Sequence, residues 1–149
     1  MPRLSGLKVV RSPKHGYGVV ATRPFARGEV IAQVDGYLWT EDQNLDDTYS
    51  LYVDETTYYD MLDQTRWVNH SCDPNADVEA ERGDEGQGWA RIVALRAIAV
   101  GEEIAYDYAF PAALAEPCRC GAARCRGFIV AEDALGDLLD QQRRRRVNA

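Results

Sequence analysis

Four cysteines are the feature that most constrains how this chain can fold, because three of them lie together as Cys118-x-Cys120-x4-Cys125 and the fourth is Cys72. The first residues lack the apolar stretch of about 7–15 residues that is typical of a secretory signal, so we expect reduced thiols. The short spacings, with Gly121 in the connecting loop, allow several sulfurs to converge about 2.3 Å from one ion. They predict a closed, structural four-cysteine zinc site; free buried thiols or two disulfides are the alternatives.

The composition is that of one globular domain. The chain has 149 residues, of which 46% are apolar and 28% are charged, which suits a single core and excludes disordered, collagen-like and coiled-coil classes. No apolar run approaches the roughly 18 residues of a membrane span. We therefore expect no membrane partner, and a cytoplasmic protein in a bacterium or a nuclear one in a eukaryote.

The charge is unevenly distributed. The net charge of −7 argues against a nucleic-acid partner, since such proteins need a cationic surface. Every charged side chain from Arg3 to Arg27 is basic, whereas every one from Asp35 to Asp63 is acidic. The acidic stretch suits either a docking surface for a basic peptide or a solvated face, and both interpretations stay open.

Hydrophobic patterning predicts a mainly β fold. The expected elements are strands at Leu7–Val10, Val19–Ala21, Val30–Val34, Tyr49–Val53, Trp89–Ile98 and Glu103–Phe110, a short helical turn within Asp60–Trp67 and an exposed hairpin loop at Arg82–Gly88.

A final helix is predicted over Glu132–Arg146, where Leu135, Leu138 and Leu139 have helical spacing. The run Arg143–Arg146 would complement the C-terminal end of that helix. The same run could also bind nucleic acid or an acidic partner.

Three further segments contain residue types that are frequent in active sites: Lys14-His-Gly-Tyr-Gly18, the run Arg66-Trp-Val-Asn-His-Ser-Cys-Asp-Pro-Asn75, and Gly101-Glu-Glu-Ile-Ala-Tyr-Asp-Tyr108. Taken singly, each has an ordinary structural explanation. A Gly-x-Gly turn permits close backbone approach, Asp73-Pro74 is typical of a turn, and alternate tyrosines on a strand share one face.

In this order, and followed by the cysteine motif, the three segments closely resemble the SET-domain protein-lysine methyltransferases with a post-SET cysteine motif. The resemblance implies small β-sheets around a pseudoknot, in which Asn69–Asn75 and Tyr106–Tyr108 pass through each other's loops, followed by a post-SET zinc loop and a short helix. It divides the chain into a SET domain (1–111), a zinc-binding segment (112–130) and a helix with a basic tail (131–149). It also makes Cys72 the fourth zinc ligand.

The resemblance further implies S-adenosylmethionine as cofactor and transfer of its methyl group to a lysine amine. Tyr108 would be the catalytic tyrosine, and Tyr106 would occupy the Phe/Tyr position that limits product to mono- or dimethyl-lysine. The residues implied to bind the cofactor are Gly16, Tyr17, Gly18, Tyr49, Arg66, Asn69, His70, Tyr108 and Phe128. Many relatives have a tyrosine at the position of Val34, and Tyr37 could take its place.

The expected function is therefore an S-adenosylmethionine-dependent protein-lysine methyltransferase that acts on a basic protein such as a histone or histone-like protein. A homodimer is compatible with the sequence. One alternative is an inactive, zinc-stabilised SET scaffold that serves as a protein-interaction module, which only Val34 favours. A nucleic-acid-binding zinc protein is a further alternative, supported by the arginine run and opposed by the net charge.

Overall fold

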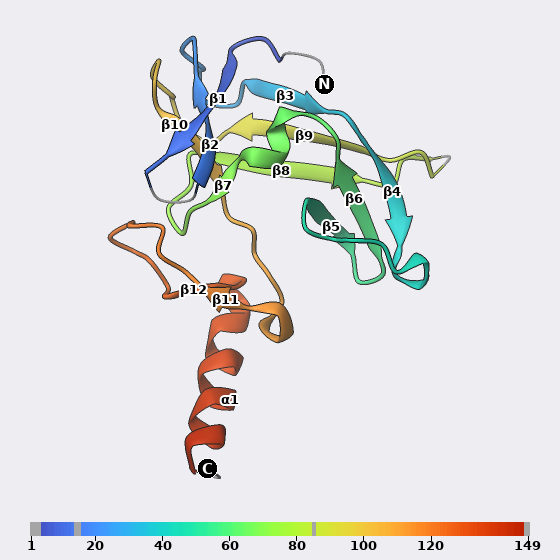
Figure 1. Cartoon of the computed structure of the whole chain (residues 1–149), viewed down its shortest axis with the longest axis vertical. Helices are drawn as coiled ribbons and strands as arrows, with labels where there is room; N and C mark the ends of the chain where they lie inside the picture. Colours follow the sequence, from blue (N-terminus) through green and yellow to red (C-terminus); the bar gives the residue numbers. More distant parts are fainter. Residues whose placement is uncertain (1–3, 14–15, 85, 148–149) are drawn as a thin grey trace.

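Short strands make up most of the regular secondary structure, and a C-terminal helix extends away from them (Figure 1). The computed structural model describes residues 4–13, 16–84 and 86–147. The strands are β1 (Leu7–Ser12), β2 (Gly16–Ala21), β3 (Val30–Val34), β4 (Gly36–Thr40), β5 (Ser50–Asp54), β6 (Thr57–Met61), β7 (Asn69–His70), β8 (Ala76–Glu81), β9 (Trp89–Ala94), β10 (Glu103–Tyr106), β11 (Glu116–Pro117) and β12 (Phe128–Ile129). The helices are the 3-10 turns η1 (Glu41–Gln43), η2 (Gln64–Trp67), η3 (Ala112–Leu114) and η4 (Glu132–Ala134) and the α-helix α1 (Leu135–Val147).

The strands form small separate sheets, which confirms the predicted mainly β class. Their orders are β1-β2-β10-β7, β3-β9-β8 and β4-β6-β5, with a β11-β12 ribbon. The core lies between them: in β9, Ala90, Ile92 and Ala94 are buried while the intervening side chains are less covered. Full burial of a side chain the size of Ile92 contributes about 1.5–3 kcal/mol.

The two segments that the resemblance places at a crossing lie side by side. β7 runs parallel to β10, with Asn69 opposite Ala105 and His70 opposite Tyr106. Asn75 fastens the end of the first segment, since its Nδ2 donates to the Glu103 carbonyl at 2.8 Å and its Oδ1 accepts from the Ala105 N–H at 3.0 Å. A parallel pair cannot be made by a tight hairpin, so this contact joins distant parts of the chain.

The predicted strand Val30–Val34 is confirmed as β3. The boundaries of several other predicted elements need correction. The helical turn within Asp60–Trp67 begins only at Gln64, because the strand β6 continues to Met61. The Asp63 carboxylate then caps the turn by accepting from the Thr65 N–H at 2.9 Å.

Two strands end earlier than predicted. The strand expected over Trp89–Ile98 ends at Ala94, after which the chain bends, and Ile98 pairs with Phe25 only as an isolated antiparallel bridge. The strand expected over Glu103–Phe110 ends at Tyr106. There Ala109 turns the backbone with a φ of +50°, which extended structure does not allow.

The C-terminal helix is confirmed, with η4 as its first turn. Leu138 is its buried residue, while Leu139 is 43% exposed, so only a narrow face of α1 packs on the rest of the chain. Arg144–Arg146 occupy its last turn, as predicted. No helix among the described residues is both long and apolar enough to span a bilayer.

Candidate active site and metal centre

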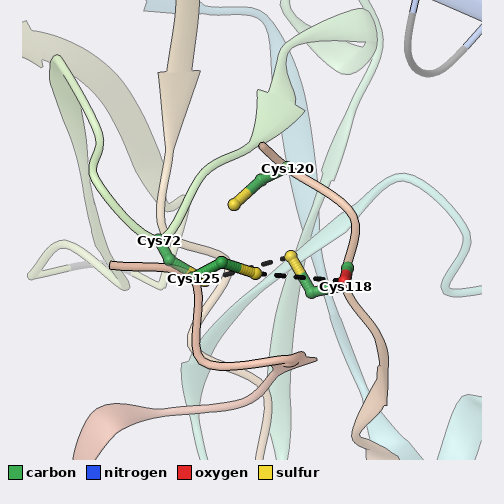
Figure 2. A group of neighbouring side chains, drawn as sticks. All are labelled: Cys72, Cys118, Cys120 and Cys125. Carbon is green, nitrogen blue, oxygen red and sulfur yellow. Dashed lines mark hydrogen bonds between the residues drawn. The ribbon is translucent and has the colours of Figure 1, made fainter. Parts of the chain in front are cut away.

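The four cysteine sulfurs converge on one point (Figure 2). Cys72 comes from the loop after β7, and the other three come from the loop between β11 and β12. All four are reduced, and their sulfurs lie within 4.8 Å of one another. A tetrahedral zinc ion with Zn–S distances of about 2.3 Å requires sulfurs about 3.8 Å apart, and Cys72 and Cys118 are 3.9 Å apart. The donor set and its spacing fit a closed structural zinc site, and the disulfide alternative does not hold.

Backbone N–H groups donate hydrogen bonds to two of these sulfurs. The backbone N–H of Arg126 donates to Cys72 Sγ at 3.4 Å, and that of Gly127 donates to Cys125 Sγ at 3.4 Å. Such donors stabilise metal-bound thiolates. Burial raises the pKa of Cys118 to about 12, whereas at Cys120 burial is outweighed by backbone donors of Cys72 and Ala122, which lower the pKa to about 6. Without metal, Cys118 would therefore retain a proton that metal binding must release.

The loop between β11 and β12 has little other support. From residue 112 to 129, Cys120 is the buried side chain, and all others are partly or fully exposed. Apolar burial therefore contributes little to the free energy of folding of this segment. A metal ion bound by the four cysteines would hold this segment in place.

A cavity of about 290 Å³ lies between this loop and the segments that contain the predicted site residues. Asn69, His70 and Tyr108 form one wall. The other wall comes from the zinc-binding segment and consists of Glu116, Pro117, Cys118, Arg119 and Ile129. Residues far apart in the sequence are thus brought together, and the loop that contains the cysteine cluster forms one side of the cavity.

Asn69 connects this cavity to the Gly-x-Gly turn. Its Nδ2 donates to the Tyr17 carbonyl at 2.7 Å and to Glu103 Oε2 at 3.3 Å. Gly18 packs against the same groups, so that a Cβ at this position would come within 3.0 Å of the Glu103 carboxylate and 3.1 Å of Asn69 Nδ2. A larger residue at position 18 would therefore require the Glu103 carboxylate or the Asn69 amide to shift.

An aromatic cluster extends the site on the side of Tyr17. The Arg66 guanidinium carbon lies 4.0 Å from the centre of the Tyr49 ring. The ring of Trp67 lies 5.4 Å from that of Tyr17 and 5.3 Å from that of Tyr49. Trp67 was not predicted from the sequence, although its position directly after Arg66 was a usable signal. Arg66 Nε is buried with no hydrogen-bond partner, which suits a site that receives a polar or anionic ligand group.

The two predicted catalytic tyrosines are adjacent, with ring centres 5.0 Å apart. Tyr108 Oη donates to the Val68 carbonyl at 2.5 Å. Tyr106 is buried, and its Oη lies 3.9 Å from Met61 Sδ. Burial raises the pKa of Tyr106 well above its ordinary value, with the Tyr108 hydroxyl adding to the effect. Burial also raises the pKa of Tyr108, to which the Glu103 charge contributes. Both hydroxyls therefore stay protonated.

His70 links the tyrosines to the cysteine cluster. Its Nδ1 accepts from the Tyr108 backbone N–H at 3.0 Å, and its Nε2 lies 3.4 Å from Cys72 Sγ. Since Nδ1 acts as acceptor, the hydrogen-bond network assigns the proton to Nε2, which faces the sulfur. The histidine thus contacts both the cavity and the zinc ligands.

Some predicted site residues lie outside the cavity. Phe128 lines a separate cavity of about 170 Å³ beside α1, while its neighbour Ile129 faces the main one. Gly16 is exposed, with a φ of +76°. Val34 is buried and its carbonyl accepts from Tyr59 Oη at 2.9 Å, whereas Tyr37 is 44% exposed.

If S-adenosylmethionine binds here, as the resemblance implies, Gly18→Ala should weaken its binding by at least about tenfold, because the added methyl group would displace the Asn69 amide or the Glu103 carboxylate. Titration calorimetry would measure this change. Gly136→Ala in α1 is the control, since no atom lies within 4 Å of the place that its added methyl group would take. Equal affinity of Gly18→Ala and the original protein would exclude Gly18 from the cofactor site.

Comparison with known proteins agrees with this geometry. The family model of the SET domain matches residues 16–109. The chain is 34% identical over 145 residues to the H3 lysine-4 specific histone-lysine N-methyltransferase of Cryptococcus neoformans, covering 85% of this chain and 10% of the relative. It is 36% identical over 137 residues to human histone-lysine N-methyltransferase 2B, covering 81% of this chain and 5% of the relative.

Solved structures show the same fold. KRYPTONITE in complex with mCHG DNA and SAH matches with a TM-score of 0.72 and 25% identity, covering 86% of this chain and 30% of that one. A second KRYPTONITE structure, with mCHH DNA, an H3(1-15) peptide and SAH, matches with a TM-score of 0.70 and 24% identity, covering 85% of this chain and 30% of that one. The chain thus spans only a small part of these much longer proteins. The chain belongs to the SET-domain family.

Proposed function

We propose that this chain is an S-adenosylmethionine-dependent protein-lysine N-methyltransferase that adds one or two methyl groups to a basic protein. The observation that carries the proposal is the cavity in which Asn69, His70 and Tyr108 face the zinc-binding segment. The relatives named above are histone-lysine methyltransferases. The division into a SET domain (1–111), a zinc-binding segment (112–130) and a terminal helix (131–149) is part of the same proposal.

S-adenosylmethionine, when bound, supplies a methyl group on a positively charged sulfur. Gly18 and Asn69 would line its site beside the hydrogen bond from the Asn69 side chain to the Tyr17 carbonyl, and Arg66 offers a buried donor without a partner. Gly16, Tyr17, Tyr49, His70, Tyr108 and Phe128 complete the proposed set. The fit rests on the close approach at Gly18 and on the donor at Arg66, and SAH in the KRYPTONITE structure supports it.

The residues around Tyr108 suit a neutral amine. A lysine has an ordinary pKa of about 10.4, so it must lose its proton before it can act as nucleophile. Buried aromatic surroundings favour the neutral form. The Tyr108 hydroxyl is fixed by its bond to the Val68 carbonyl, and this pair can orient the amine. Orientation of this kind accounts for a large part of the rate of a displacement reaction.

We expect the rate of methyl transfer to rise between pH of about 6 and about 9.5, as the target lysine loses its proton. Because the pKa of Tyr108 lies above its ordinary value, its neutral form persists across this range and produces no fall in rate. Initial rates at saturating cofactor would test this. A descending limb below pH of about 9.5 that disappears in Tyr108→Phe would show that the tyrosine ionises and would contradict the assignment.

The products test the proposed function and the role of Tyr106. A buried tyrosine hydroxyl beside Tyr108 leaves less room for a methylated amine, so we expect mono- and dimethyl-lysine after incubation with S-adenosylmethionine and core histones. Tandem mass spectrometry would identify them. Mainly trimethyl-lysine would exclude the proposed role of Tyr106, and absence of methyl-lysine from histones and from other basic proteins would contradict the function.

A basic substrate is supported by the sheet β4-β6-β5, because every charged residue from Asp35 to Asp63 is acidic. The first relative is specific for H3 lysine-4 by name, which favours a histone tail in a nucleus if the source is a eukaryote. A homodimer stays a proposal. The second candidate function, an inactive zinc-stabilised scaffold for protein interaction, would keep the metal centre and lose cofactor binding.

A further inference from the structure

A partly buried ion pair joins the metal centre to the end of β10. Arg126 directly follows the ligand Cys125, and its Nη2 lies 2.8 Å from both carboxylate oxygens of Asp107. Its side chain is 10% exposed and that of Asp107 is 28% exposed. Among the described residues this is the most enclosed arginine–carboxylate pair; that of Arg124 with Asp73 is 72% and 60% exposed.

The arginine is also attached to a zinc ligand through its backbone. Its N–H donates to Cys72 Sγ at 3.4 Å, while its guanidinium reaches Asp107. The two ends of one residue therefore contact the metal centre and the Tyr106–Tyr108 segment. The guanidinium keeps this position although its Nε is buried without a hydrogen-bond partner. Burial of an unpaired donor costs free energy, which a solvent-exposed arginine would not lose.

The carboxylate of Asp107 shapes the turn around Tyr108. Its Oδ1 accepts from the Ala109 N–H at 3.0 Å, and Ala109 has a φ of +50°. A residue other than glycine in this conformation costs about 1–2 kcal/mol and persists only when surrounding contacts fix it. Tyr108 lies between Asp107 and Ala109, and its backbone N–H donates to His70 Nδ1 at 3.0 Å.

We propose that the Arg126–Asp107 pair positions Tyr108, so that folding of the zinc-binding segment sets the place of the catalytic hydroxyl. Arg126 and Asp107 are positioning residues, since neither lines the cavity beside Asn69, His70 and Tyr108. Removal of the guanidinium leaves a partly buried carboxylate without its cation. The Asp107 carboxylate, which accepts from the Ala109 N–H, is then no longer held in place by Arg126. This inference rests on the proposed methyltransferase function for its kinetic effect, but its structural effect does not depend on activity.

The test compares Arg126→Gln with Arg124→Gln, which removes the exposed pair with Asp73 in the same loop. We expect Arg126→Gln to lower kcat by at least about tenfold, with the KM for S-adenosylmethionine within about threefold and one zinc retained per chain by metal analysis. Arg124→Gln should match the original protein in all three. Only one guanidinium nitrogen, Nη2, contacts the two Asp107 carboxylate oxygens, so a lysine ammonium can replace this contact. We therefore expect Arg126→Lys to recover part of the lost kcat.

Hydrogen exchange supplies a measurement that is independent of methyl transfer. In the zinc-bound protein, amides in the segment 106–109 should exchange at least about tenfold faster in Arg126→Gln than in Arg124→Gln. Unchanged exchange and unchanged kcat would overturn the inference. Loss of zinc from Arg126→Gln would also overturn it, since the residue would then support the metal site. Faster exchange in a protein with no methyltransferase activity would contradict the proposed function and leave the structural coupling in place.

Discussion

Replacement of Cys118 by serine is expected to remove zinc from the protein and to lower methyl transfer to below about 1% of the original rate, a loss of at least about 2.7 kcal/mol in barrier terms. Cys118 lines the cavity, and its Sγ lies 3.9 Å from Cys72 Sγ. The segment it belongs to buries almost no apolar surface. Without its metal it has little to hold it against the cavity.

Three measurements check this result: zinc content, protease sensitivity between residues 112 and 130, and initial rate. Ala123→Ser is the matched control, because it adds a hydroxyl to an exposed position in the same loop without touching a ligand. Removal of zinc by a chelator should reproduce the effect of Cys118→Ser. An active Cys118→Ser protein that retains one zinc ion per chain would contradict the assignment of the cluster.

Tyr108→Phe is expected to lower kcat by at least about tenfold, or about 1.4 kcal/mol, while the affinity for S-adenosylmethionine changes little. The substitution removes the hydroxyl that bonds to the Val68 carbonyl and leaves the ring contacts with Tyr106 and His70 in place. The loss should therefore fall on orientation of the amine rather than on binding.

Tyr52→Phe is the matched control for this substitution. Its hydroxyl lies on the sheet β4-β6-β5, 3.2 Å from that of Tyr58, the residue is 42% exposed, and it does not line the cavity beside Tyr108. We expect its kcat at saturating protein substrate to stay within about twofold of the original. Equal turnover by Tyr108→Phe and the original protein would remove Tyr108 from the mechanism.

Local sequence signals predicted the elements whose pattern is regular. Val30–Val34 was predicted with its correct bounds, and the strand predicted from Trp89 begins at that residue. The strand β4 was missed because Gly36–Thr40 lies among turn-forming residues and becomes a strand only by pairing with β6. The stacked rings of Trp39 and Tyr58, 4.3 Å apart, stabilise that pairing and are not adjacent in sequence.

The site was predictable where a motif is continuous and not where contacts join distant segments. The four cysteines and the residues Asn69, His70 and Tyr108 were named from the sequence. The parallel pairing of β7 with β10 and the pair between Arg126 and Asp107 depend on how loops far apart in the chain meet. Phe128 was placed by its position after Cys125, but strand alternation turns its neighbour Ile129 toward the main cavity.

The most direct test of the proposed function is transfer of a labelled methyl group from S-adenosylmethionine to core histones and to a mixture of basic proteins, with Tyr108→Phe assayed in parallel and cofactor binding followed by calorimetry. We expect label on lysine with the original protein and at least about tenfold less with Tyr108→Phe. Absence of both transfer and cofactor binding in a folded, zinc-loaded protein would contradict the proposed function and would favour the inactive scaffold.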